Sequence, residues 1–485
     1  MTQCTYHRNY RDLKTGKEEH FECREPEWKG GRCKFHSKHY LKNKTEKDVI
    51  QEFEQLLDRE VKISSVLLCI GYHLPSISLE SILDSSRKIN MYIYFNNAKF
   101  YKKIDFSDIK FSKHVSFTET EFYDTVSFRA SEFSEDVDFS HAKFKGNSNS
   151  FQFTKFEKQA DFSHGEIRNA KFIQTEFAKV NFNYRTFVNN TFFANAKFHG
   201  TSVFKNTIFQ GKTDFSESIF SESVVFENTE FAPFVNFIQS EFKGHCIFNG
   251  NISNVSFLGM EIDKIKFGNE VSWKTQDPES KREKIKSLLN WVRNSDFKIF
   301  DERNLENQFK ENKETIISLE SIKNLYRDLR DNFDLRLRYE TSGEFHVREM
   351  ELKRKYREKH KDGKIVTVKR NPFLKHASIH WAYNILAQYG QSYYRPIYFA
   401  VIIISIASVY FLFNGVKSSD NEQIEYSFTE LLLKSIARSI AGLIPFDIFN
   451  EQIEYSDRIL RVTLLPVSAT FFIALKRRLE RKFRH

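Results

Sequence analysis

The chain has 485 residues, a formal net charge of +10 and 51 phenylalanines, and this length leaves room for several domains. Residues 1–60 are polar and lack the apolar segment of a secretory signal peptide, so we expect the N-terminus to lie in the cytosol. In a reducing compartment the five cysteines argue against a disulfide framework, and the basic tail at 476–485 suits a lipid headgroup at least as well as a nucleic acid.

The first 45 residues are rich in cysteine and histidine. Two C-x2-H units, at 4–7 and 33–36, flank Cys23, and short units of this kind place two ligands on one tetrahedral ion. A segment of this size cannot form a core, so a structural zinc ion would supply the folding energy. A polar tail without metal is the alternative, and a catalytic zinc is disfavoured because no acidic residue nearby stands out as a general base. The expected ligands are Cys4, Cys23, Cys33 and His36, with His7 or His20 as a substitute.

Residues 46–94 are expected to form a helical cap or linker, and residues 95–267 carry the most regular pattern of the chain. Phenylalanine recurs there at alternating intervals of six and five residues, which fits neither the helical period nor strand alternation. The interval fits a coil that turns a corner every five or six residues, so the pattern predicts a β-solenoid with stacked coils and a phenylalanine core. The regular positions are Phe100, Phe106, Phe111, Phe117, Phe122, Phe128, Phe133, Phe139 and Phe144, then Phe193, Phe198, Phe204, Phe209, Phe215, Phe220, Phe226, Phe231, Phe237, Phe242 and Phe248.

A small residue stands two positions before many of these phenylalanines, as in AKF at 98–100 and SEF at 131–133. This motif resembles that of the pentapeptide-repeat proteins, in the variant whose central residue is Phe. The resemblance implies a right-handed quadrilateral β-helix of roughly 22 residues per coil, so that residues 95–267 would form about eight coils. Such a solenoid is a scaffold, and we expect function at its ends and on its surface. Bulges or changes of face are expected where the spacing breaks, at 145–151, Ile167, Ile252 and Ile262.

Residues 268–392 are expected to form a charged α-helical domain, with a helical pattern from 278 to about 360. The stretch 321–355 resembles the helical hairpin that follows Phe-type repeats in many bacterial pentapeptide-repeat membrane proteins, including its GEF and REMELK elements. The resemblance implies a tetratricopeptide-like helix pair and no catalysis. A solvated face or an intersubunit salt bridge, rather than an acid–base group, is expected for three neighbouring residues: His346, Arg348 and Glu349.

Residues 393–485 are expected to form a transmembrane module. The segment 396–416 runs 21 residues without a charge, which is long enough to cross a hydrocarbon core of about 30 Å as a helix. The second candidate span, 459–475, has only 14 uncharged residues after Arg461, so Arg461 and Lys476 must snorkel to the interface. Basic residues precede the first span and follow the second at 476–485, which places both flanks in the cytosol if both segments cross.

A third segment, 427–446, lies between the two candidate spans and is flanked on both sides by the acidic heptapeptide NEQIEYS. This order resembles the two-transmembrane module of potassium-type channels, which the pentapeptide-repeat family also carries after a YG…R element, here Tyr389, Gly390 and Arg395. The resemblance implies a re-entrant pore segment and a homo-oligomer, expected to be a tetramer. No TVGYG-like run is present, so we expect a wide, weakly selective pore. The expected pore-lining residues are Lys434, Ser435, Arg438, Ser439, Gly442 and Pro445, and the expected outer vestibule comprises Glu422, Glu425, Glu451, Glu454 and Asp457.

These features together predict a multidomain protein of a bacterial inner membrane, with several spans and with both termini in the cytoplasm. We expect a ligand- or partner-gated pore that dissipates ion gradients. The architecture resembles that of membrane effectors of bacterial anti-phage abortive defence, such as the effector of the Hailong system. No residue pattern identifies the gating signal, and a nucleotide, an oligonucleotide and a protein all stay open.

Three other functions have different requirements. A membrane-anchored adaptor needs one span and no pore segment, and it is the serious rival. A soluble DNA-mimicking pentapeptide protein needs an acidic solenoid and no span, whereas this chain is basic. An enzyme is disfavoured because no Gly-rich phosphate loop, nucleophile elbow or paired-carboxylate motif stands at an interpretable place, so we expect no catalytic residues.

Overall fold

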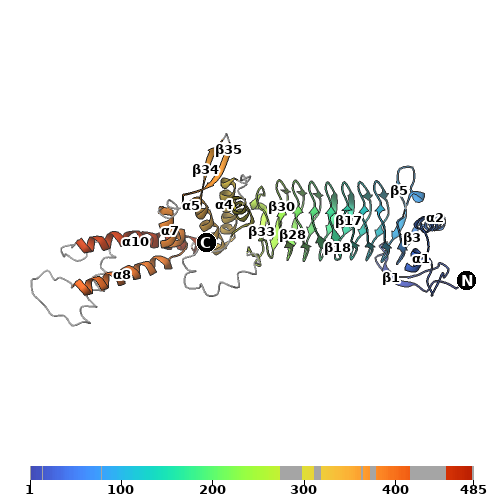
Figure 1. Cartoon of the computed structure of the whole chain (residues 1–485), viewed down its shortest axis with the longest axis horizontal. Helices are drawn as coiled ribbons and strands as arrows, with labels where there is room; N and C mark the ends of the chain where they lie inside the picture. The colour runs from blue at the N-terminus through green and yellow to red at the C-terminus, as the bar shows by residue number, and fades with distance from the viewer. Residues whose placement is uncertain are drawn as a thin grey trace, which may run out of the picture. The chain divides into compact units, whose positions relative to one another are not determined.

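The structure, a computed structural model, describes residues 2–13, 15–77, 79–273, 298–310, 318–361, 364–371, 378–414 and 455–482. The chain divides into two compact units (Figure 1). The solenoid unit comprises residues 1–276 and 298–304, and the helical unit comprises residues 277–297 and 305–485. Short parallel strands make up most of the solenoid unit, while helices predominate in the helical unit.

The solenoid unit begins with a small module of one β-hairpin and two helices. Its elements are β1 (His7–Arg11), β2 (Glu18–Glu22), α1 (Lys38–Asn43) and α2 (Glu46–Ile63). At the start of α2 the Thr45 hydroxyl accepts a hydrogen bond from the Asp48 N–H, and the Asp48 carboxylate accepts one from the Thr45 N–H. This capping box fixes where the helix begins. The buried side of α2, which includes Phe53, packs near the first solenoid strand, β3 (Val66–Leu68).

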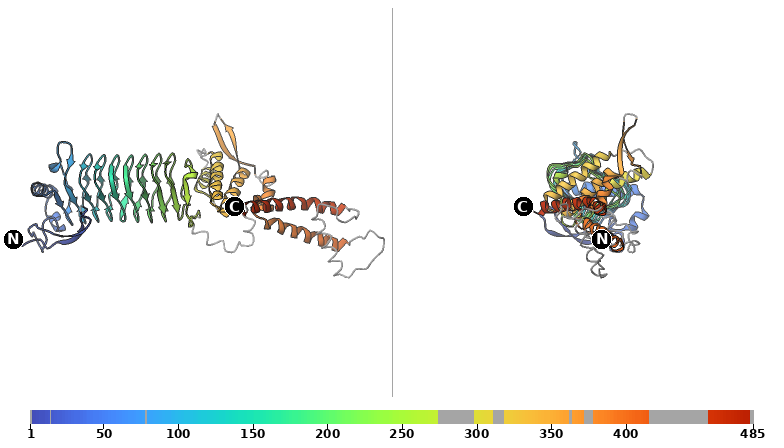
Figure 2. Two further views of the ribbon diagram at one scale, coloured as in Figure 1. Left: turned by 180° about the vertical axis from the view of Figure 1, so that it is seen from behind. Right: turned by 90° about the vertical axis from the view of Figure 1, so that its left-hand side faces the viewer.

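The remaining strands of the solenoid unit stack in parallel through about nine turns and form three sheets (Figure 2). The 8-stranded sheet contains β4 (His73–Leu74), β7 (Lys99–Phe100), β11 (Glu121–Phe122), β15 (Lys143–Phe144), β18 (Glu166–Arg168), β21 (Thr186–Val188), β25 (Ile208–Phe209) and β29 (Glu230–Phe231). The 7-stranded sheet contains β8 (Ile104–Asp105), β12 (Val126–Ser127), β16 (Asn149–Ser150), β19 (Ala170–Lys171), β22 (Thr191–Phe192), β26 (Thr213–Asp214) and β30 (Val235–Asn236).

The 16-stranded sheet consists of two rows that join at the long strands β17 (Lys155–Asp161) and β20 (Glu176–Asn181). One row also contains β3, β6 (Tyr92–Tyr94), β10 (Val115–Ser116), β14 (Val137–Asp138), β24 (Ser202–Val203), β28 (Val224–Glu227), β32 (Cys246–Asn249) and β33 (Ile265–Phe267). The other row contains β5 (Lys88–Ile89), β9 (Lys110–Phe111), β13 (Glu132–Phe133), β23 (Lys197–Phe198), β27 (Ile219–Phe220) and β31 (Glu241–Phe242). The two rows and the other two sheets give each coil four faces.

Phenylalanine rings fill the interior and stack from coil to coil. Phe122 lies in register with Phe100 and Phe144, and its ring centroid is 5.2 and 4.8 Å from theirs. The rings of Phe193 and Phe215 are 4.6 Å apart and nearly parallel. Every regularly spaced phenylalanine named above is buried, with at most 6% of its surface exposed. The phenylalanine spacing therefore predicted the core of the solenoid correctly.

Buried hydroxyl groups tie each coil to the one before it. The hydroxyl of Thr120 donates to the Phe95 carbonyl at 2.7 Å, and the hydroxyl of Thr175 donates to the Phe151 carbonyl at 2.6 Å. The same bond recurs with Thr154, Thr207, Ser218 and Ser240 as donors. These bonds satisfy interior carbonyl groups that water cannot reach.

Arg185 occupies the place of one of these hydroxyl residues and is fully buried. Its guanidinium group donates to the carbonyl of Phe162 and, at 2.6 and 2.8 Å, to the carbonyls of Ala142 and Phe139. The side chain therefore forms hydrogen bonds to the two coils immediately before its own. It passes Gly165, where an added Cβ would lie 2.8 Å from the Arg185 Nη1.

Charges alternate along one row of strands on the outside of the solenoid. Lys110, Glu132, Lys155, Glu176 and Lys197 stand in register on successive coils. Lys110 forms an ion pair with Glu132, and Lys197 forms one with Glu176 at 2.8 Å. Opposite charges on directly facing positions favour this register over its alternatives.

The strands begin before the phenylalanine repeat does. Within residues 66–94, where the sequence indicated a helical cap or linker, the strands β3 to β6 already belong to the solenoid sheets. The first coil fills its interior with Leu67, Leu74 and Ile89, all buried. Leu74 and Ile89 stand in register with Phe100 and Phe111 of the next coil, so the phenylalanine interval does not reveal the first coil.

One of the predicted irregularities coincides with a departure from regular pairing, and another lies close to one. The register between β17 and β20 shifts between Phe156 and Gln159, shortly after the predicted break at 145–151. Ile262 begins a 3-10 turn, η2 (Ile262–Lys264), between β32 and β33. Ile167, by contrast, stays in the phenylalanine row between Phe144 and Phe187 and is fully buried, so it substitutes for phenylalanine without a bulge at that position.

Residues 298–304 pack on the last turns of the solenoid. The ring of Phe300 stacks on Phe234 at 5.3 Å. The Asp301 carboxylate accepts hydrogen bonds from the Ser256 hydroxyl at 2.6 Å and the Phe257 N–H at 3.0 Å. Burial raises the pKa of Asp301 to about 6. The segment thus closes the C-terminal end of the stacked core, which solenoids require.

The helical unit is built around a pair of packed helices. Its elements are α3 (Phe300–Lys310), which starts in the solenoid unit, then α4 (Leu319–Leu335), α5 (Tyr339–Lys355), β34 (Tyr356–Lys361), β35 (Lys364–Lys369), α7 (Ile379–Ala387), η4 (Gln388–Gly390), α8 (Tyr394–Asn414) and α10 (Tyr455–Lys482). The short 3-10 turn η1 (Glu80–Ile82) belongs to the solenoid unit. Helices α4 and α5 pack on each other through Phe333 and Phe345, whose ring centroids are 5.2 Å apart. The hairpin of β34 and β35 replaces the helix expected as far as residue 360, and the β-branched run at 366–368 favours this outcome.

The two candidate spans both coincide with helices, α8 and α10, which lie side by side (Figure 2). Among the described residues, none of the helices combines the length and the apolar character that a membrane crossing requires. The segment 427–446 lies outside the described residues, as do all the expected pore-lining residues and four of the five vestibule residues. The fifth, Asp457, lies in α10, and its side chain is not described.

Candidate metal centre

The four expected ligands converge in the N-terminal module. Cys4 precedes β1, Cys23 follows β2, and Cys33 and His36 lie between the hairpin and α1. One donor atom from each of these residues lies within 4.8 Å of the others, and all four residues are buried. The group is therefore a preformed cluster of three thiols and one imidazole, drawn from three separate segments.

The distances within the cluster match the edges of a small tetrahedron. The sulfur atoms of Cys23 and Cys33 are 3.7 Å apart, and the Nδ1 atom of His36 lies 3.1 Å from the Cys33 sulfur and 3.5 Å from the Cys4 sulfur. A zinc ion with bonds of about 2.3 Å to sulfur and about 2.0 Å to nitrogen separates its ligands by roughly 3.8 and 3.5 Å. The cluster could therefore hold such an ion with little movement.

The hairpin places the first two cysteines next to each other. The N–H of Cys4 donates to the Glu25 carbonyl at 3.0 Å, and the N–H of Cys23 donates to the Tyr6 carbonyl at 3.0 Å. Gly31 brings in the third cysteine through a tight approach, because an added Cβ at Gly31 would lie 2.9 Å from the Thr5 hydroxyl oxygen. Its φ of +76° also favours glycine.

His36 is oriented by the first coil of the solenoid. Its Nε2 atom lies 2.8 Å from the Ile70 carbonyl, which only a protonated Nε2 can satisfy, so Nδ1 keeps its lone pair toward the sulfurs. The imidazole also stacks on Tyr6 at 3.9 Å. The metal site and the end of the solenoid are therefore linked through one side chain.

The cluster favours a thiolate at Cys33. The Cys23 thiol donates a hydrogen bond to the Cys33 sulfur and His36 lies beside it, which lowers the pKa of Cys33 to about 4. The same hydrogen bond raises the pKa of Cys23. The backbone N–H of Cys33 points to the Cys4 sulfur at 3.2 Å. Thiolates are the form of cysteine that binds metal ions.

Comparison with known proteins identifies the repeat. The family model described as pentapeptide repeats (9 copies) matches residues 95–143 and 204–250. The solenoid is made of pentapeptide repeats. No curated protein and no solved structure matches the chain. The match confirms the resemblance of the repeat to pentapeptide repeats, and it does not extend to the N-terminal module or the helical unit.

The substitute ligands lie apart from the cluster. His7 and His20 face each other across the hairpin, with ring centroids 5.5 Å apart, and both are exposed. His20 instead lies 2.7 Å from the side-chain oxygen of Asn9. The other two cysteines, Cys69 and Cys246, are buried singly in the pentapeptide solenoid, where burial raises the pKa of each thiol.

Glu349, which was expected on a solvated face or in an intersubunit salt bridge, is buried within the chain. Only 3% of its side chain is exposed, and its carboxylate meets Arg327 at 3.4 Å, Arg330 at 3.2 Å and Lys353 at 2.8 Å. The packing of α4 against α5 encloses it, which the charge pattern of one helix does not reveal. These ion pairs give Glu349 a structural role.

A second buried carboxylate was missed by the sequence analysis. Glu351 of α5 accepts hydrogen bonds from the Tyr389 hydroxyl at 2.7 Å, from Arg354 at 2.7 Å and from the Asn384 amide at 3.2 Å. Arg477 of α10 donates to the Tyr389 carbonyl at 2.6 Å. Tyr389 belongs to the YG…R element, so the resemblance had singled out one partner of this cluster without the others.

Proposed function

We propose that this pentapeptide-repeat protein is a membrane protein whose C-terminal helices form a homo-oligomeric, ion-conducting pore under the control of its solenoid and helical units. The observation that carries the proposal is the exposed apolar surface of α8. A tetramer in the inner membrane of a bacterium, with both termini in the cytoplasm, fits the basic flanks of the two candidate spans.

The apolar surface of α8 is wider than an amphipathic helix presents. Its exposed large apolar residues are Ile397, Tyr398, Val401, Ile402, Ile406, Val409 and Tyr410, and Ile406 is 66% exposed. At about 100° per residue, these positions cover more than half of the helix circumference. A continuous apolar surface of this kind marks an interaction site or a membrane contact.

Three hydroxyl side chains of α8 and α10 form hydrogen bonds within their own helices. The hydroxyl groups of Ser405 and Ser408 donate to the carbonyls of Val401 and Ile404 at 2.8 Å, and the hydroxyl of Thr470 donates to the Val467 carbonyl at 2.9 Å. A hydroxyl placed in hydrocarbon needs such a bond, because no water is available there. This pattern supports an apolar environment for both helices.

The pore itself rests on the sequence. The segment 427–446 between the two helices carries Lys434 and Arg438 one turn apart, and charges at this depth are tolerated only where they line water or are buried in protein. Opening would depolarise the membrane, the outcome expected of an effector in anti-phage defence. We propose no catalytic role. An adaptor that uses the helices only as an anchor is the second candidate, favoured by the same apolar surface.

Flux through liposomes separates the two candidates. We expect the purified chain to float with liposomes in a density gradient. We also expect it to let ions cross the liposome membrane, which an entrapped ion-sensitive dye reports as a change in signal. Replacing Gly442 or Ser439 with Leu should alter the ion flux while flotation and oligomer size stay unchanged. Replacing Ile406, which is exposed on α8, with Lys should abolish flotation. Flotation of the wild-type chain without ion flux would favour the adaptor, and failure of the wild-type chain to float would exclude both candidates. Wild-type flux in inserted, oligomeric Gly442→Leu and Ser439→Leu variants would contradict a pore lined by these two residues.

We also infer that the metal of the N-terminal centre is zinc and that it is structural. Three thiol ligands and one imidazole suit zinc, and four protein ligands leave no open position for a reacting water. The ion would stabilise a module that has little core of its own.

A further inference from the structure

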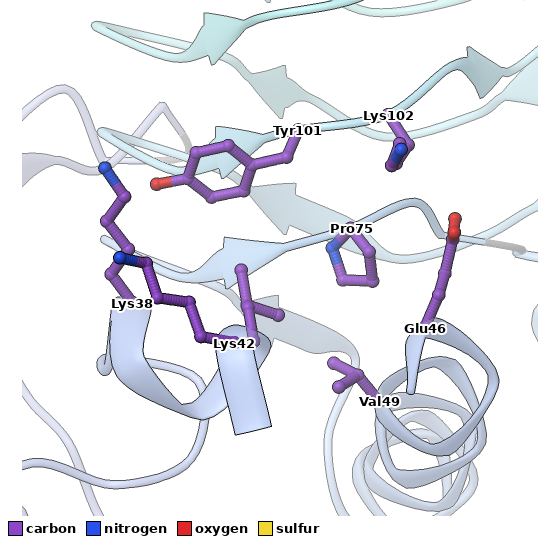
Figure 3. Close-up of a pocket in the computed structure, with 8 residues that line it drawn as sticks. Lys38, Lys42, Glu46, Val49, Pro75, Tyr101 and Lys102 are labelled. Carbon is purple, nitrogen blue, oxygen red and sulfur yellow. The ribbon is translucent and has the colours of Figure 1, made fainter. Parts of the chain in front are cut away.

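A pocket of about 230 Å³ lies between the N-terminal helices and the first coils of the solenoid (Figure 3). No function described so far uses it. Its residues come from α1, from α2, and from the segments that follow β4 and β7. They are Lys38, Leu41, Lys42, Glu46, Val49, Pro75, Tyr101 and Lys102.

The pocket carries a surplus of positive charge. It is lined by Lys38, Lys42 and Lys102 but by a single carboxylate, that of Glu46. Among the residues that the structure describes, none of these three lysines forms an ion pair. Lys38 and Lys42 stand one turn apart on α1, and Figure 3 shows both ammonium groups on the side of the pocket near Tyr101. An anion at this side would meet both charges together.

Tyr101 forms a fixed aromatic wall of the pocket. Its hydroxyl lies 2.8 Å from Nδ1 of His73, and its ring stacks on His73 at 6.0 Å and on Tyr123 at 5.1 Å. The Lys38 ammonium lies 6.0 Å from the centre of the same ring. Burial raises the pKa of Tyr101 to about 12, so the phenol stays neutral and does not repel an anion.

The opposite side of the pocket has a different character. Figure 3 shows Pro75 and Val49 in the middle, with Glu46 and Lys102 beyond them. A ligand therefore meets two ammonium groups at one end, an apolar surface in the middle, and a mixed polar pair at the other end. The volume is smaller than that of pockets for drug-sized molecules, which begin at about 300 Å³.

We propose that this pocket binds a small organic phosphate monoester, with the phosphate between Lys38 and Lys42 and its apolar or aromatic part against Val49, Pro75 and Tyr101. A phosphate monoester carries about −1.5 to −2 charges at neutral pH, which the two unpaired ammonium groups balance. Binding at this pocket is independent of the pore. Only a role of the ligand in gating would rest on the proposed function.

Calorimetric titration of the full-length chain in detergent tests the proposal, with phenyl phosphate as the probe and phenol and inorganic phosphate as comparison ligands. We expect saturable 1:1 binding of phenyl phosphate that weakens as salt is added, because the lysines are exposed. The double variant Lys38→Ala/Lys42→Ala should weaken binding at least tenfold. Lys62→Ala, which removes an exposed lysine from the last turn of α2, is the matched control and should bind like the wild type.

Four results would overturn the proposal. They are the absence of saturable binding by the wild type, unchanged affinity in the double variant, equal weakening by Lys62→Ala, and inorganic phosphate binding as tightly as phenyl phosphate. An unchanged melting temperature shows that the variants are folded, and Tyr101→Phe provides a milder second variant that keeps the aromatic wall. Liposome flux with and without phenyl phosphate then tests gating separately, so that loss of the pore and loss of the binding site are told apart.

Discussion

Inside the solenoid the guanidinium of Arg185 passes so close to Gly165 that a Cβ on residue 165 would come within 2.8 Å of the Arg185 Nη1 and 2.3 Å of the Ala142 carbonyl oxygen. Gly165 also has a φ of +70°. Because residue 165 has no side chain, the long side chain of Arg185 can pass the coil that contains Gly165 and bond to Ala142 and Phe139 on the coil before it.

We expect Gly165→Ala to lower the free energy of unfolding by about 3 kcal/mol, because it combines backbone strain with a clash against the Ala142 carbonyl and displacement of a buried guanidinium. Gly16→Ala is the matched control, since Gly16 has a similar φ of +72° but nothing within 4 Å of the added Cβ. It should cost about 1 kcal/mol. Denaturant unfolding measures both losses, and equal losses would show that the close approach of Gly165 to Ala142 and Arg185 is unimportant for stability.

Phe215→Asp should unfold the solenoid. Phe215 is fully buried, and its ring stacks between Phe193 at 4.6 Å and Phe237 at 5.0 Å, so an ionised carboxylate there has no partner. Phe215→Leu leaves a smaller apolar side chain and should cost about 1 to 3 kcal/mol with the fold retained. Circular dichroism and protease resistance report the outcome, and a soluble, protease-resistant Phe215→Asp chain would contradict the stacked core.

The purified chain should contain about one zinc ion per subunit, and Cys33→Ser should lose it because a hydroxyl is a poor zinc ligand. His7→Ala should retain the ion, since His7 lies outside the cluster. Cys246→Ala serves as a control for loss of a cysteine elsewhere. Elemental analysis after dialysis measures the content, and a metal-free wild-type chain purified without chelator would remove zinc from the N-terminal module.

The cluster around Glu351 predicts a loss of stability in acid. Although burial acts to raise it, hydrogen bonds from Arg354 and Tyr389 lower the pKa of Glu351 to about 2. The ionised carboxylate therefore stabilises the helical unit above the unfolded pKa of about 4.5, and this stability is lost as the pH falls toward 2. Glu351→Gln should flatten the change in melting temperature between pH 5 and pH 2. The exposed Glu340→Gln should leave that change intact, and equal slopes in wild type and Glu351→Gln would reject the role of the cluster.

The solenoid could be predicted because each coil repeats the same local requirement. An inward residue every five or six positions leaves a visible period wherever that residue is phenylalanine, and the period becomes invisible where Leu74 or Ile89 takes the position of a phenylalanine. The bonds from Arg185 to Ala142 and Phe139, two coils earlier, have no counterpart in the repeat, so the spacing of the sequence does not predict them. Single exceptions of this kind need the packed structure.

The candidate metal centre was predicted from spacing, but spacing alone left the histidine open. His7 and His36 stand at the same distance after a cysteine. Pairing of β1 with β2 leaves His7 exposed on the hairpin, while the Ile70 carbonyl directs His36 into the cluster. The contact between Glu351 and Tyr389, 38 residues apart, lay beyond sequence reasoning because it depends on how α5 meets the turn after α7.

The alternating row from Lys110 to Lys197 limits how the solenoid can change in length. Removing one of the three inner coils of this row, those of Glu132, Lys155 and Glu176, would place lysine against lysine or glutamate against glutamate on the coils that become neighbours. Removing two adjacent inner coils, or duplicating two adjacent coils of the row, would keep a lysine against a glutamate at the new junction. Within this row, growth and shortening of the solenoid by recombination are therefore electrostatically neutral only in steps of two coils.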